Sequence, residues 1–350
     1  MPGEQLTVAV TGPTGTFGAG LMPKLQDEAR IRRIVGIARR PFDPAEHGWT
    51  KMEYRRGDVR DEAALAEAFA GADVVVHLAF MITGAASRAT IRAINVEGTL
   101  NTFRAAAAAG VSRFVYASSV AAYGFHRDNP VGLTEDWPTR PATRLFYAQE
   151  KAELEELLAD EHAAARTPIG LYLLRPPIVV GPHAVGAKIA VPSVPSLARL
   201  FGNRTGLPRL PVPVPLPVPQ LPLQLIHEDD VGQALLLAAL GAGPAGAYNI
   251  AGDGVLTLAA VAREFGLLPI PVPAGISQAA AAAATRMHLP FLPPSVDWIE
   301  ALTHPAIMDT TKAREQLGWR PRYSALEALR DTVRGASGQP AASGQPGASG

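Results

Sequence analysis

The chain has 350 residues, and its 32 Lys and Arg residues balance 32 Asp and Glu residues, so the formal net charge at pH 7 is zero. This balance argues against nucleic acid or an acidic membrane surface as a partner. Because the sequence contains no cysteine, disulfide bonds, thiolate catalysis, iron–sulfur clusters and cysteine-ligated zinc are excluded. A hydrophobic content of 47% predicts a globular chain, and the length is about that of two domains.

The N-terminal residues carry an acid, Glu4, and no basic stretch. The apolar run behind them is short and ends in a glycine loop, which predicts a first strand and not a signal peptide. No uninterrupted apolar stretch approaches the roughly 18 residues of a transmembrane helix. The sequence therefore predicts a cytoplasmic protein without a membrane anchor.

Short β-branched runs alternate with alanine-rich or charged stretches between residues 5 and 182. This alternation predicts βαβ units and a doubly wound, Rossmann-type parallel sheet covered by helices on both faces. Such a sheet binds its ligand beyond the carboxyl ends of the strands, where the strand order reverses. The predicted strands are Leu6–Thr11, Ile34–Ala38, Val74–Ala79, Arg113–Ser118 and Gly170–Arg175, and the predicted helices are Asp61–Phe69, Thr90–Ala109 and Tyr147–His162.

The alternation weakens after Gly181. We expect a first domain over residues 1–182 and a smaller, proline-broken second lobe over residues 183–334. Two later strands, Leu223–His227 and Ala247–Ile250, are expected to return to the main sheet.

Two segments are set apart by their composition. Proline recurs, largely at alternate positions, between Leu207 and Pro222. Because proline fits neither a helix interior nor a central strand, this segment is expected to be an extended, polyproline-like surface strip. Residues 335–350 repeat a unit of Ala, Ser, Gly, Gln and Pro and are expected to be a disordered tail.

The first predicted strand leads directly into a GxxGxxG loop, Thr11–Gly18, and then into a helical stretch, Ala19–Leu25. Glycine allows a tight turn, close approach of the backbone to a pyrophosphate, and packing of helix on strand. The helix N-terminus offers amide groups and a positive dipole to phosphates. A glycine triplet alone is equally compatible with a structural turn, and it is the position after the first strand that predicts a dinucleotide site. The expected contacts are Gly12, Thr14, Gly15, Thr16, Phe17 and Gly18.

The end of the second strand bears on the choice of cofactor. An acid there would hold the ribose 2′-hydroxyl of NAD, whereas arginine suits the 2′-phosphate of NADP. Ala38 occupies the acid position, and Arg39 and Arg40 follow, so NADP is favoured over NAD, the alternative being that both arginines are solvated loop charges. After the third strand, Asp58, followed by Val59, is placed to reach the adenine amino group, and a helix-cap or turn role is the alternative.

Tyr147 and Lys151 are spaced i and i+4, which places them on one helix face. An ammonium group stabilises a phenolate, so the spacing predicts a lowered pKa for Tyr147 and proton transfer near neutral pH. A tyrosine–lysine pair at this spacing is common by chance, and alone it is more typical of a surface contact. Ser119 follows the strand before this helix, at the sheet edge where catalytic groups lie, and its hydroxyl could bond the same substrate oxygen.

With these pieces in place, the chain resembles the extended short-chain dehydrogenase/reductases, the NAD-dependent epimerase/dehydratase family, over roughly residues 6–333. The resemblance implies a nicotinamide-binding domain with a small C-terminal substrate lobe. Its motifs stand in the family's order as Thr11–Gly18, Gly57-Asp58, His77-Leu78-Ala79, Asn95–Thr99, Ser118–Gly124, Tyr147–Lys151, Arg175-Pro176, Gly181-Pro182, Ile226–Val231 and Tyr248–Ile250.

The resemblance implies Ser119, Tyr147 and Lys151 as the catalytic residues. Tyr147 would exchange the proton of a carbonyl or alcohol oxygen, Ser119 would orient that oxygen, and Lys151 would lower the pKa of Tyr147 and bond the nicotinamide ribose. The remaining implied cofactor contacts are Leu78, Ala79, Asn95, Ser118, Pro177 and Ile178.

Departures from the family's sequence patterns reduce the number of candidate reactions. Dehydratases of the family carry Thr-Asp-Glu where this chain has Ser119, Val120 and Ala121, so both carboxyl groups for water elimination are missing. Sugar-nucleotide epimerases usually carry an Arg-Asp-aromatic run before the Ile-His segment, and here Pro222–Leu225 occupies that place. We therefore predict NAD(P)-dependent oxidation or reduction of a small apolar molecule. The alternatives are a UDP-sugar 4-epimerase that retains NAD and a non-catalytic dinucleotide sensor.

The expected substrate contacts are Phe80 and Met81 in the loop after the fourth strand, with His126 near the pocket mouth. Phe80 and Met81 could equally be core residues, and His126 a solvated one. His227 and the three acids after it are interpreted as a helix start and not as a metal site. By analogy with the family, the two long helices Thr90–Ala109 and Tyr147–His162 would form a homodimer interface.

Overall fold

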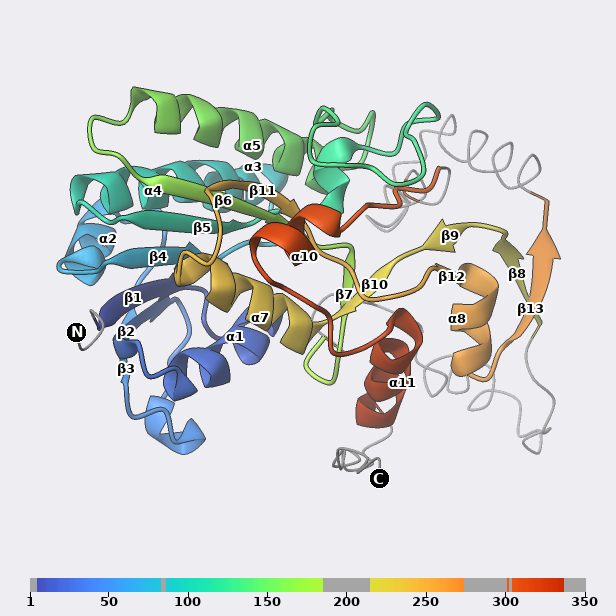
Figure 1. Cartoon of the computed structure of the whole chain (residues 1–350), viewed down its shortest axis with the longest axis horizontal. Coiled ribbons are helices and arrows are strands. Elements are labelled where there is room, and N and C mark those ends of the chain that lie inside the picture. The colour runs from blue at the N-terminus through green and yellow to red at the C-terminus, as the bar shows by residue number, and fades with distance from the viewer. Residues whose placement is uncertain (1–4, 83–85, 185–214, 274–300, 302–303, 337–350) are drawn as a thin grey trace.

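A seven-stranded parallel sheet forms the centre of the molecule, with the strand order β11-β6-β5-β4-β1-β2-β3 (Figure 1). This computed structural model describes residues 5–82, 86–184, 215–273, 301 and 304–336. The chain order reverses between β1 and β4, which marks the crevice where such sheets bind their ligands. The strands are β1 (Leu6–Thr11), β2 (Ile31–Ala38), β3 (Met52–Arg56), β4 (Val74–His77), β5 (Arg113–Ala117), β6 (Gly170–Arg175) and β11 (Gly246–Asn249).

Helices cover both faces of the sheet, because the side chains of each strand alternate between them. Val8 and Val10 of β1 face the helices α1, α7 and α10, whereas Ala9 faces α2, α4 and α5. The predicted doubly wound fold is therefore confirmed. The helices are α1 (Thr16–Asp27), α2 (Glu62–Phe69), α4 (Gly98–Ala108), α5 (Phe146–Ala164), α7 (Glu228–Ala239), α8 (Leu258–Glu264), α10 (Thr311–Gln316) and α11 (Ala325–Ala336), with a 3₁₀ turn at η1 (Pro44–His47).

The helix predicted over Thr90–Ala109 is interrupted. Its first part is the short helix α3 (Arg88–Arg92), a π-helical turn η2 (Ala93–Glu97) follows, and α4 then continues. At the junction the Thr99 hydroxyl donates to the Asn95 carbonyl at 2.5 Å, which the periodicity of the sequence could not reveal.

Helices α1 and α7 cross at two glycines on the same face of the sheet. A Cβ atom on Gly20 would lie 2.1 Å from the Glu228 carbonyl oxygen, and one on Gly232 would lie 2.1 Å from the Gly20 carbonyl oxygen. The two backbones are therefore in direct contact, with no side chain between them.

Strand Leu223–His227 does not return to the main sheet, so that prediction is wrong, whereas β11 does take its place beside β6. Pro176 and Pro177 lack amide hydrogens, so β6 ends and the chain leaves the sheet before the next strand. The second lobe is instead built from three two-stranded sheets: β7 (Ile178–Val180) with β10 (Leu225–His227), β9 (Pro222–Leu223) with β12 (Leu256–Thr257), and β8 (Pro215–Pro219) with β13 (Leu268–Val272).

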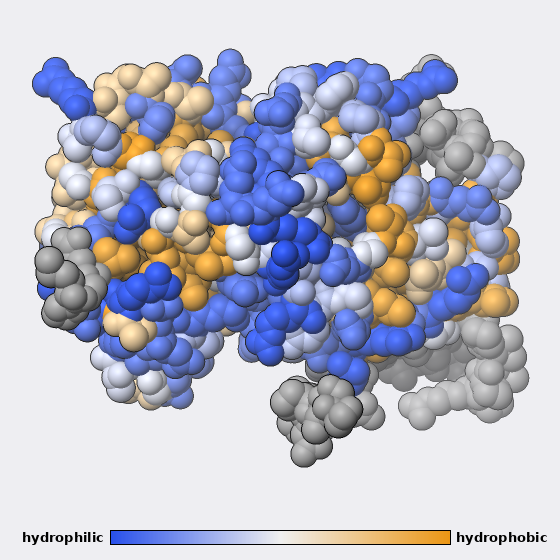
Figure 2. Space-filling model, viewed as in Figure 1, coloured by the Kyte–Doolittle hydropathy of each residue, from blue (hydrophilic) through white to orange (hydrophobic). Residues whose placement is uncertain are grey.

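The described end of the proline-rich strip, β8, pairs in parallel with β13. It is extended, as expected, but it belongs to a two-stranded sheet, where both strands are edges that tolerate proline. Figure 2 shows apolar surface over this part of the lobe, to which Leu268 and Ile270 contribute, each about half exposed. Residues 207–214 of the strip and residues 337–350 of the expected tail lie outside the described residues. The expected start of the tail at Gly335 is wrong, because Gly335 and Ala336 belong to α11.

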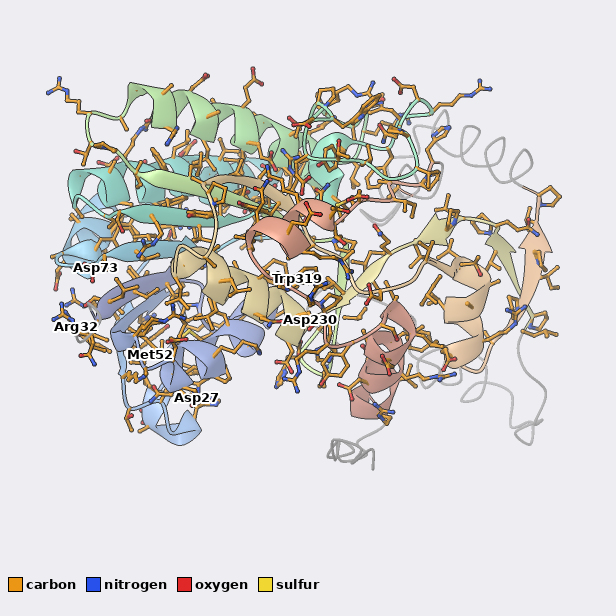
Figure 3. All side chains as sticks on the ribbon, viewed as in Figure 1. Asp27, Arg32, Met52, Asp73, Asp230 and Trp319 are labelled. Carbon is orange, nitrogen blue, oxygen red and sulfur yellow. The ribbon has the colours of Figure 1, made fainter. Side chains whose placement is uncertain are left out.

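The C-terminal segment is anchored to the sheet through α7. Figure 3 shows Trp319 beside Asp230, and the Trp319 indole donates to the Asp230 carbonyl oxygen at 3.0 Å. The Asp230 carboxylate accepts the backbone amides of Arg322 and Tyr323 at 2.8 and 3.2 Å. Because Trp319 is fully buried, these contacts fix α10 and α11 relative to the main domain.

Candidate active site

The glycine loop packs against the end of β4. Gly12 has a φ of +71°, and a Cβ atom there would lie 2.9 Å from the backbone nitrogen of Ala79. A Cβ atom on Gly18 would lie 1.9 Å from the Pro13 carbonyl oxygen. Both positions therefore require glycine, and Leu78 and Ala79, two expected cofactor contacts, lie beside the loop.

The N-terminus of α1 opens from this loop. Its N-cap is Gly15, the first turn contains no acid, and the Thr16 hydroxyl is buried without a hydrogen-bond partner. A buried polar atom without a partner is costly. The unpaired hydroxyl and the positive end of the helix dipole together fit an anionic group such as a pyrophosphate. Of the other loop residues, Thr14 is exposed and Phe17 is half-buried.

A chain of hydrogen bonds ties β1, β4 and α4 together below the loop. The amides of Leu78 and Ala79 donate to the Thr11 hydroxyl, which contacts His77 Nδ1 at 2.7 Å. His77 Nε2 lies 2.9 Å from the Thr99 hydroxyl, whose own proton goes to the Asn95 carbonyl. The only consistent tautomer carries its proton on Nε2. Burial, assisted by the Lys151 charge, lowers the pKa of His77 to about 3.

This neutral histidine predicts acid-dependent stability. The folded-state pKa of His77 lies below its ordinary value of 6.5, so its contribution is complete above pH 6.5 and is lost as the pH falls toward 3. The expected loss is roughly 1.4 kcal/mol per pH unit. Urea unfolding of the wild type and His77→Asn at pH 7.5, 5.5 and 4.5 measures it. The variant should lose less stability than the wild type, and parallel pH profiles would contradict the prediction.

The structure brings the three expected catalytic residues together at the carboxyl end of β5. Ser119 is the N-cap of η3 (Val120–Tyr123), where its hydroxyl accepts the Ala121 amide at 3.2 Å. The Tyr147 phenol, from the first turn of α5, is hydrogen-bonded to Ser119. Lys151 lies one turn further along the same helix and is 2% exposed. Two hydroxyl groups and an ammonium group from separate segments therefore share one location.

The predicted lowering of the Tyr147 pKa is wrong. Burial raises this pKa to about 12, and the hydrogen bond to Ser119 opposes the rise. The Lys151 ammonium lies 5.9 Å from the centre of the Tyr147 ring and donates to the Tyr116 hydroxyl and the Ala117 carbonyl at 2.9 and 2.8 Å. The cost of desolvating a phenolate thus exceeds the attraction of an ammonium held by other partners.

Phe80 forms a wall of this location. Its ring meets Tyr147 edge-on, with centroids 5.7 Å apart, and the Lys151 ammonium lies 3.7 Å from its centroid. The next residue, Met81, has both backbone groups bound by the Asn95 side chain, at 2.8 and 2.9 Å. The Asn95 side chain, predicted as a cofactor contact, therefore holds this loop.

A buried ion pair lies next to the three expected catalytic residues and holds the segments that carry them. The Glu155 carboxylate pairs with the Arg175 guanidinium at 2.5 Å, and their side chains are 4% and 6% exposed. The Ser118 hydroxyl also donates to Glu155, at 2.5 Å, so the Ser118 side chain, expected to line the cofactor, faces this carboxylate. Arg175 donates further to the Tyr123 hydroxyl at 2.6 Å. The network joins β5, β6, η3 and α5 and so fixes both hydroxyl-bearing elements.

The residues expected around the adenosine lie at the carboxyl ends of β2 and β3. Arg39 and Arg40 are exposed, and their carbonyl oxygens are held by Arg56 and the Tyr54 hydroxyl. Arg60 bonds the Asp58 carboxylate and lowers its pKa. Nearby, Asp61 caps α2 and Val59 is buried against Gly98. Of the residues expected at the nicotinamide, Pro177 is buried and Ile178 is 47% exposed at the start of β7.

His126 lies in the loop after η3, half-buried. A Cβ atom on Gly124 would lie 2.4 Å from its Nε2 atom, which is buried without a hydrogen-bond partner. The imidazole therefore packs against the Gly124 backbone.

Sequence reasoning missed Tyr116, Glu150 and Glu155. Glu155 follows Lys151 by four residues, so a carboxylate on the buried face of this helix was the available signal. Tyr116 lies on β5 and is buried by α5, so its contact with Lys151 depends on helix–sheet packing that no spacing encodes.

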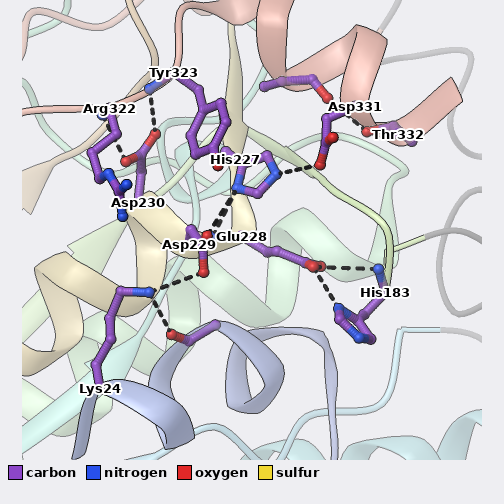
Figure 4. Close-up of polar contacts among 12 residues, drawn as sticks. Lys24, His183, His227, Glu228, Asp229, Asp230, Arg322, Tyr323, Asp331 and Thr332 are labelled. Carbon is purple, nitrogen blue, oxygen red and sulfur yellow. Dashed lines mark hydrogen bonds and ion pairs between the residues drawn. The ribbon is translucent and has the colours of Figure 1, made fainter. Parts of the chain in front are cut away.

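The acids after His227 begin α7, as interpreted from the sequence (Figure 4). His227 accepts the Asp229 amide at 3.1 Å and contacts Asp331 at 3.2 Å, whereas Glu228 bonds His183 at 2.7 Å. His227 and Glu228 thus both have structural partners, although the Glu228 Oε2 atom is buried without one. Among the described residues, no group of three or more His, Asp or Glu side chains could hold a metal ion.

Comparison with known proteins agrees with this architecture. The uncharacterized protein Rv0501 of Mycobacterium tuberculosis is 29% identical over 336 residues, which are 94% of this chain and 83% of that protein. The crystal structure of gox2253 superposes with a TM-score of 0.73 at 24% identity, covering 95% of this chain and 98% of that one. MoeE5 in complex with UDP-glucuronic acid and NAD superposes with a TM-score of 0.69 at 22% identity, covering 95% and 99%.

Within the described ranges, no helix is both long and apolar enough to span a membrane.

The profile of the NAD dependent epimerase/dehydratase family matches residues 8–251, which is more than half of the chain. The match includes the glycine loop, the Ser119–Tyr147 pair and the returning strand β11. The protein is therefore an enzyme of the NAD dependent epimerase/dehydratase family.

Proposed function

We propose that this enzyme is an NADP(H)-preferring oxidoreductase that acts on the carbonyl or secondary alcohol group of a small apolar molecule. The observation that carries the proposal is the hydrogen bond between Tyr147 and Ser119 beside buried Lys151. Two hydroxyl groups that already meet can both reach one substrate oxygen. They lie at the sheet edge next to the loop that fits a pyrophosphate.

The bound nicotinamide ring would supply or accept the hydride. Tyr147 keeps its proton at neutral pH, because its pKa is raised to about 12. In the reducing direction it would donate that proton to the carbonyl oxygen as the carbon receives the hydride. The oxidising direction is the reverse of this step and requires the phenolate form of Tyr147, which would accept the alcohol proton. Ser119 donates a hydrogen bond to the same oxygen and stabilises the charge that develops on it.

An apolar substrate suits the walls of this site. Phe80 presents an aromatic ring to Tyr147, and Ile178, which is expected to lie against the nicotinamide, is 47% exposed at the start of β7. Burial of such surface against an apolar ligand is favourable by about 25 cal/mol per Å². This apolar surface favours an apolar ketone or alcohol as the substrate rather than a sugar diphosphate.

The preference for NADP rests on Arg39 and Arg40, which are exposed beyond Ala38. Replacing both with serine is expected to raise the KM for NADPH roughly tenfold and to leave that for NADH within about twofold, because only NADPH carries the 2′-phosphate. Initial-rate kinetics with both cofactors measures this ratio. Arg33→Ser, on the same strand but paired with Glu53, is the control. Equal changes for both cofactors would contradict the proposal.

A 4-epimerase is the second candidate, because the structural relative MoeE5 was solved with UDP-glucuronic acid and NAD. An epimerase would retain NAD through purification and convert UDP-sugars without net consumption of cofactor. Mass spectrometry of the ligand released by denaturation, together with turnover of ketones and UDP-sugars, separates the two reactions. Retained NAD with UDP-sugar turnover would replace the oxidoreductase proposal.

A further inference from the structure

Glu150 is a buried acid that the proposed reaction does not use. It lies on α5 between Tyr147 and Lys151, is 1% exposed, and its Oε1 atom has no hydrogen-bond partner. Its other oxygen, Oε2, accepts a hydrogen bond from Asn95 Nδ2 at 2.7 Å. Burying a carboxyl group that has a hydrogen bond to only one oxygen is energetically unfavourable, so this arrangement calls for a structural or functional explanation.

The partner of Glu150 is the side chain that holds the loop after β4. The Asn95 amide accepts the Met81 amide at 2.8 Å and donates to the Met81 carbonyl at 2.9 Å. Its remaining contact is the bond to Glu150, which fixes the plane and the orientation of the amide. Without Glu150, Asn95 would lose one of the groups that keep both of its Met81 bonds aligned.

The loop that Asn95 holds is one wall of the proposed dinucleotide site. Its first residues, Leu78 and Ala79, donate to Thr11, and Ala79 lies against Gly12 so closely that no Cβ atom fits between them. The next residue, Phe80, contacts Lys151 and Tyr147. A shift of Met81 is therefore transmitted to the phosphate loop on one side and to the Lys151 ammonium on the other.

We propose that Glu150 is a positioning residue: through Asn95 it fixes the Met81 backbone, and thereby the wall of the nicotinamide dinucleotide site formed by Ala79 and Phe80. The inference rests on the proposed function and deepens it. In this proposal, Glu150 acts through the hydrogen-bond acceptor that it offers to Asn95 and not through its negative charge.

The surroundings of Glu150 support a role without charge. Burial raises the pKa of Glu150, and the bond from Asn95 and the charge of Arg92 oppose the rise. The Arg92 guanidinium is itself paired with Glu153 at the surface. Lys151 also faces this region, but its ammonium donates to Tyr116 and Ala117. A glutamine at position 150 would keep the acceptor for Asn95 and place its amino group where Oε1 now lies.

The test measures the Kd for NADPH of the full chain by fluorescence titration, with melting temperatures recorded without nucleotide. Glu150→Ala is expected to raise the Kd roughly tenfold, because an unsatisfied Asn95 donor and a misaligned loop weaken binding. Glu150→Asp, whose shorter side chain withdraws the oxygen from Asn95, should act in the same direction and serves if the alanine variant fails to fold. Glu150→Gln and the surface control Glu153→Ala should stay within about twofold of the wild type.

A double variant tests whether Glu150 acts on nucleotide binding through Asn95. Asn95→Ala combined with Glu150→Ala should bind NADPH no more weakly than Asn95→Ala alone, because both act through one contact. The inference is overturned if Glu150→Ala lowers only the melting temperature, if Glu150→Gln binds as weakly as Glu150→Ala, or if the double variant is additive. Failure of the wild type to bind NADPH or NADH would instead overturn the proposed function.

Discussion

Tyr147→Phe is expected to lower kcat for carbonyl reduction by roughly a thousandfold, because it removes the only group proposed to donate the proton. The ring that contacts Phe80 is retained, so the Kd for NADPH should stay within about twofold of the wild type. Stopped-flow measurement of NADPH oxidation, together with fluorescence titration, separates the two quantities.

The matched control is Tyr172→Phe, which removes a hydroxyl that donates to the Gly243 carbonyl, away from the site. This variant should keep the kcat of the wild type. If Tyr147→Phe retained more than about a tenth of the activity, general acid catalysis by this phenol would be excluded as the main source of rate.

Glu155→Ala is expected to produce the largest loss of stability of any single change to the site, about 3–5 kcal/mol in the free energy of unfolding. The variant leaves the Arg175 guanidinium buried and without its carboxylate partner, since both side chains are almost fully covered. Urea unfolding monitored by tryptophan fluorescence measures the loss. Glu153→Ala on the same helix removes a more exposed ion pair with Arg92 and should cost less than about 1 kcal/mol.

The double variant Glu155→Leu with Arg175→Met tests the cause. Replacing both charges with apolar groups removes the unpaired ion, so the pair of changes should be far less destabilising than Glu155→Ala. If the double variant were as unstable as the sum of its parts, the loss would come from packing and not from a buried charge.

Local sequence signals predicted most strands of the main sheet, although not that Leu223–His227 lies outside it. Strands β1 and β6 have the predicted bounds, because a continuous apolar run that is buried on both faces has few alternatives. The interruption of the helix before α4 was not predictable, since it involves a hydroxyl-to-carbonyl bond between Thr99 and Asn95 within an otherwise periodic stretch. The pairing of β10 with β7 could not be predicted either, because the sequences of short strands in a proline-rich lobe do not indicate which strands pair.

The sequence predicted the three expected catalytic residues of the candidate site, but neither their buried neighbours nor the direction of the Tyr147 pKa. The spacing of Tyr147 and Lys151, and the position of Ser119 after a strand, placed the three residues together. The direction of the Tyr147 pKa depends on burial by the loop after β4 and on Tyr116 and Ala117, which bind the Lys151 ammonium. These are contacts between elements distant in the chain, and only the folded arrangement reveals them.

The crossing of α1 and α7 has a consequence for how this protein tolerates change. At Gly20 and Gly232 the neighbouring main chain occupies the volume of any added methyl group. A random mutant library selected for nucleotide binding should therefore be depleted at these two codons as strongly as at Gly12 of the glycine loop. Neither glycine needs an unusual backbone angle, so this intolerance would stem from crowding alone.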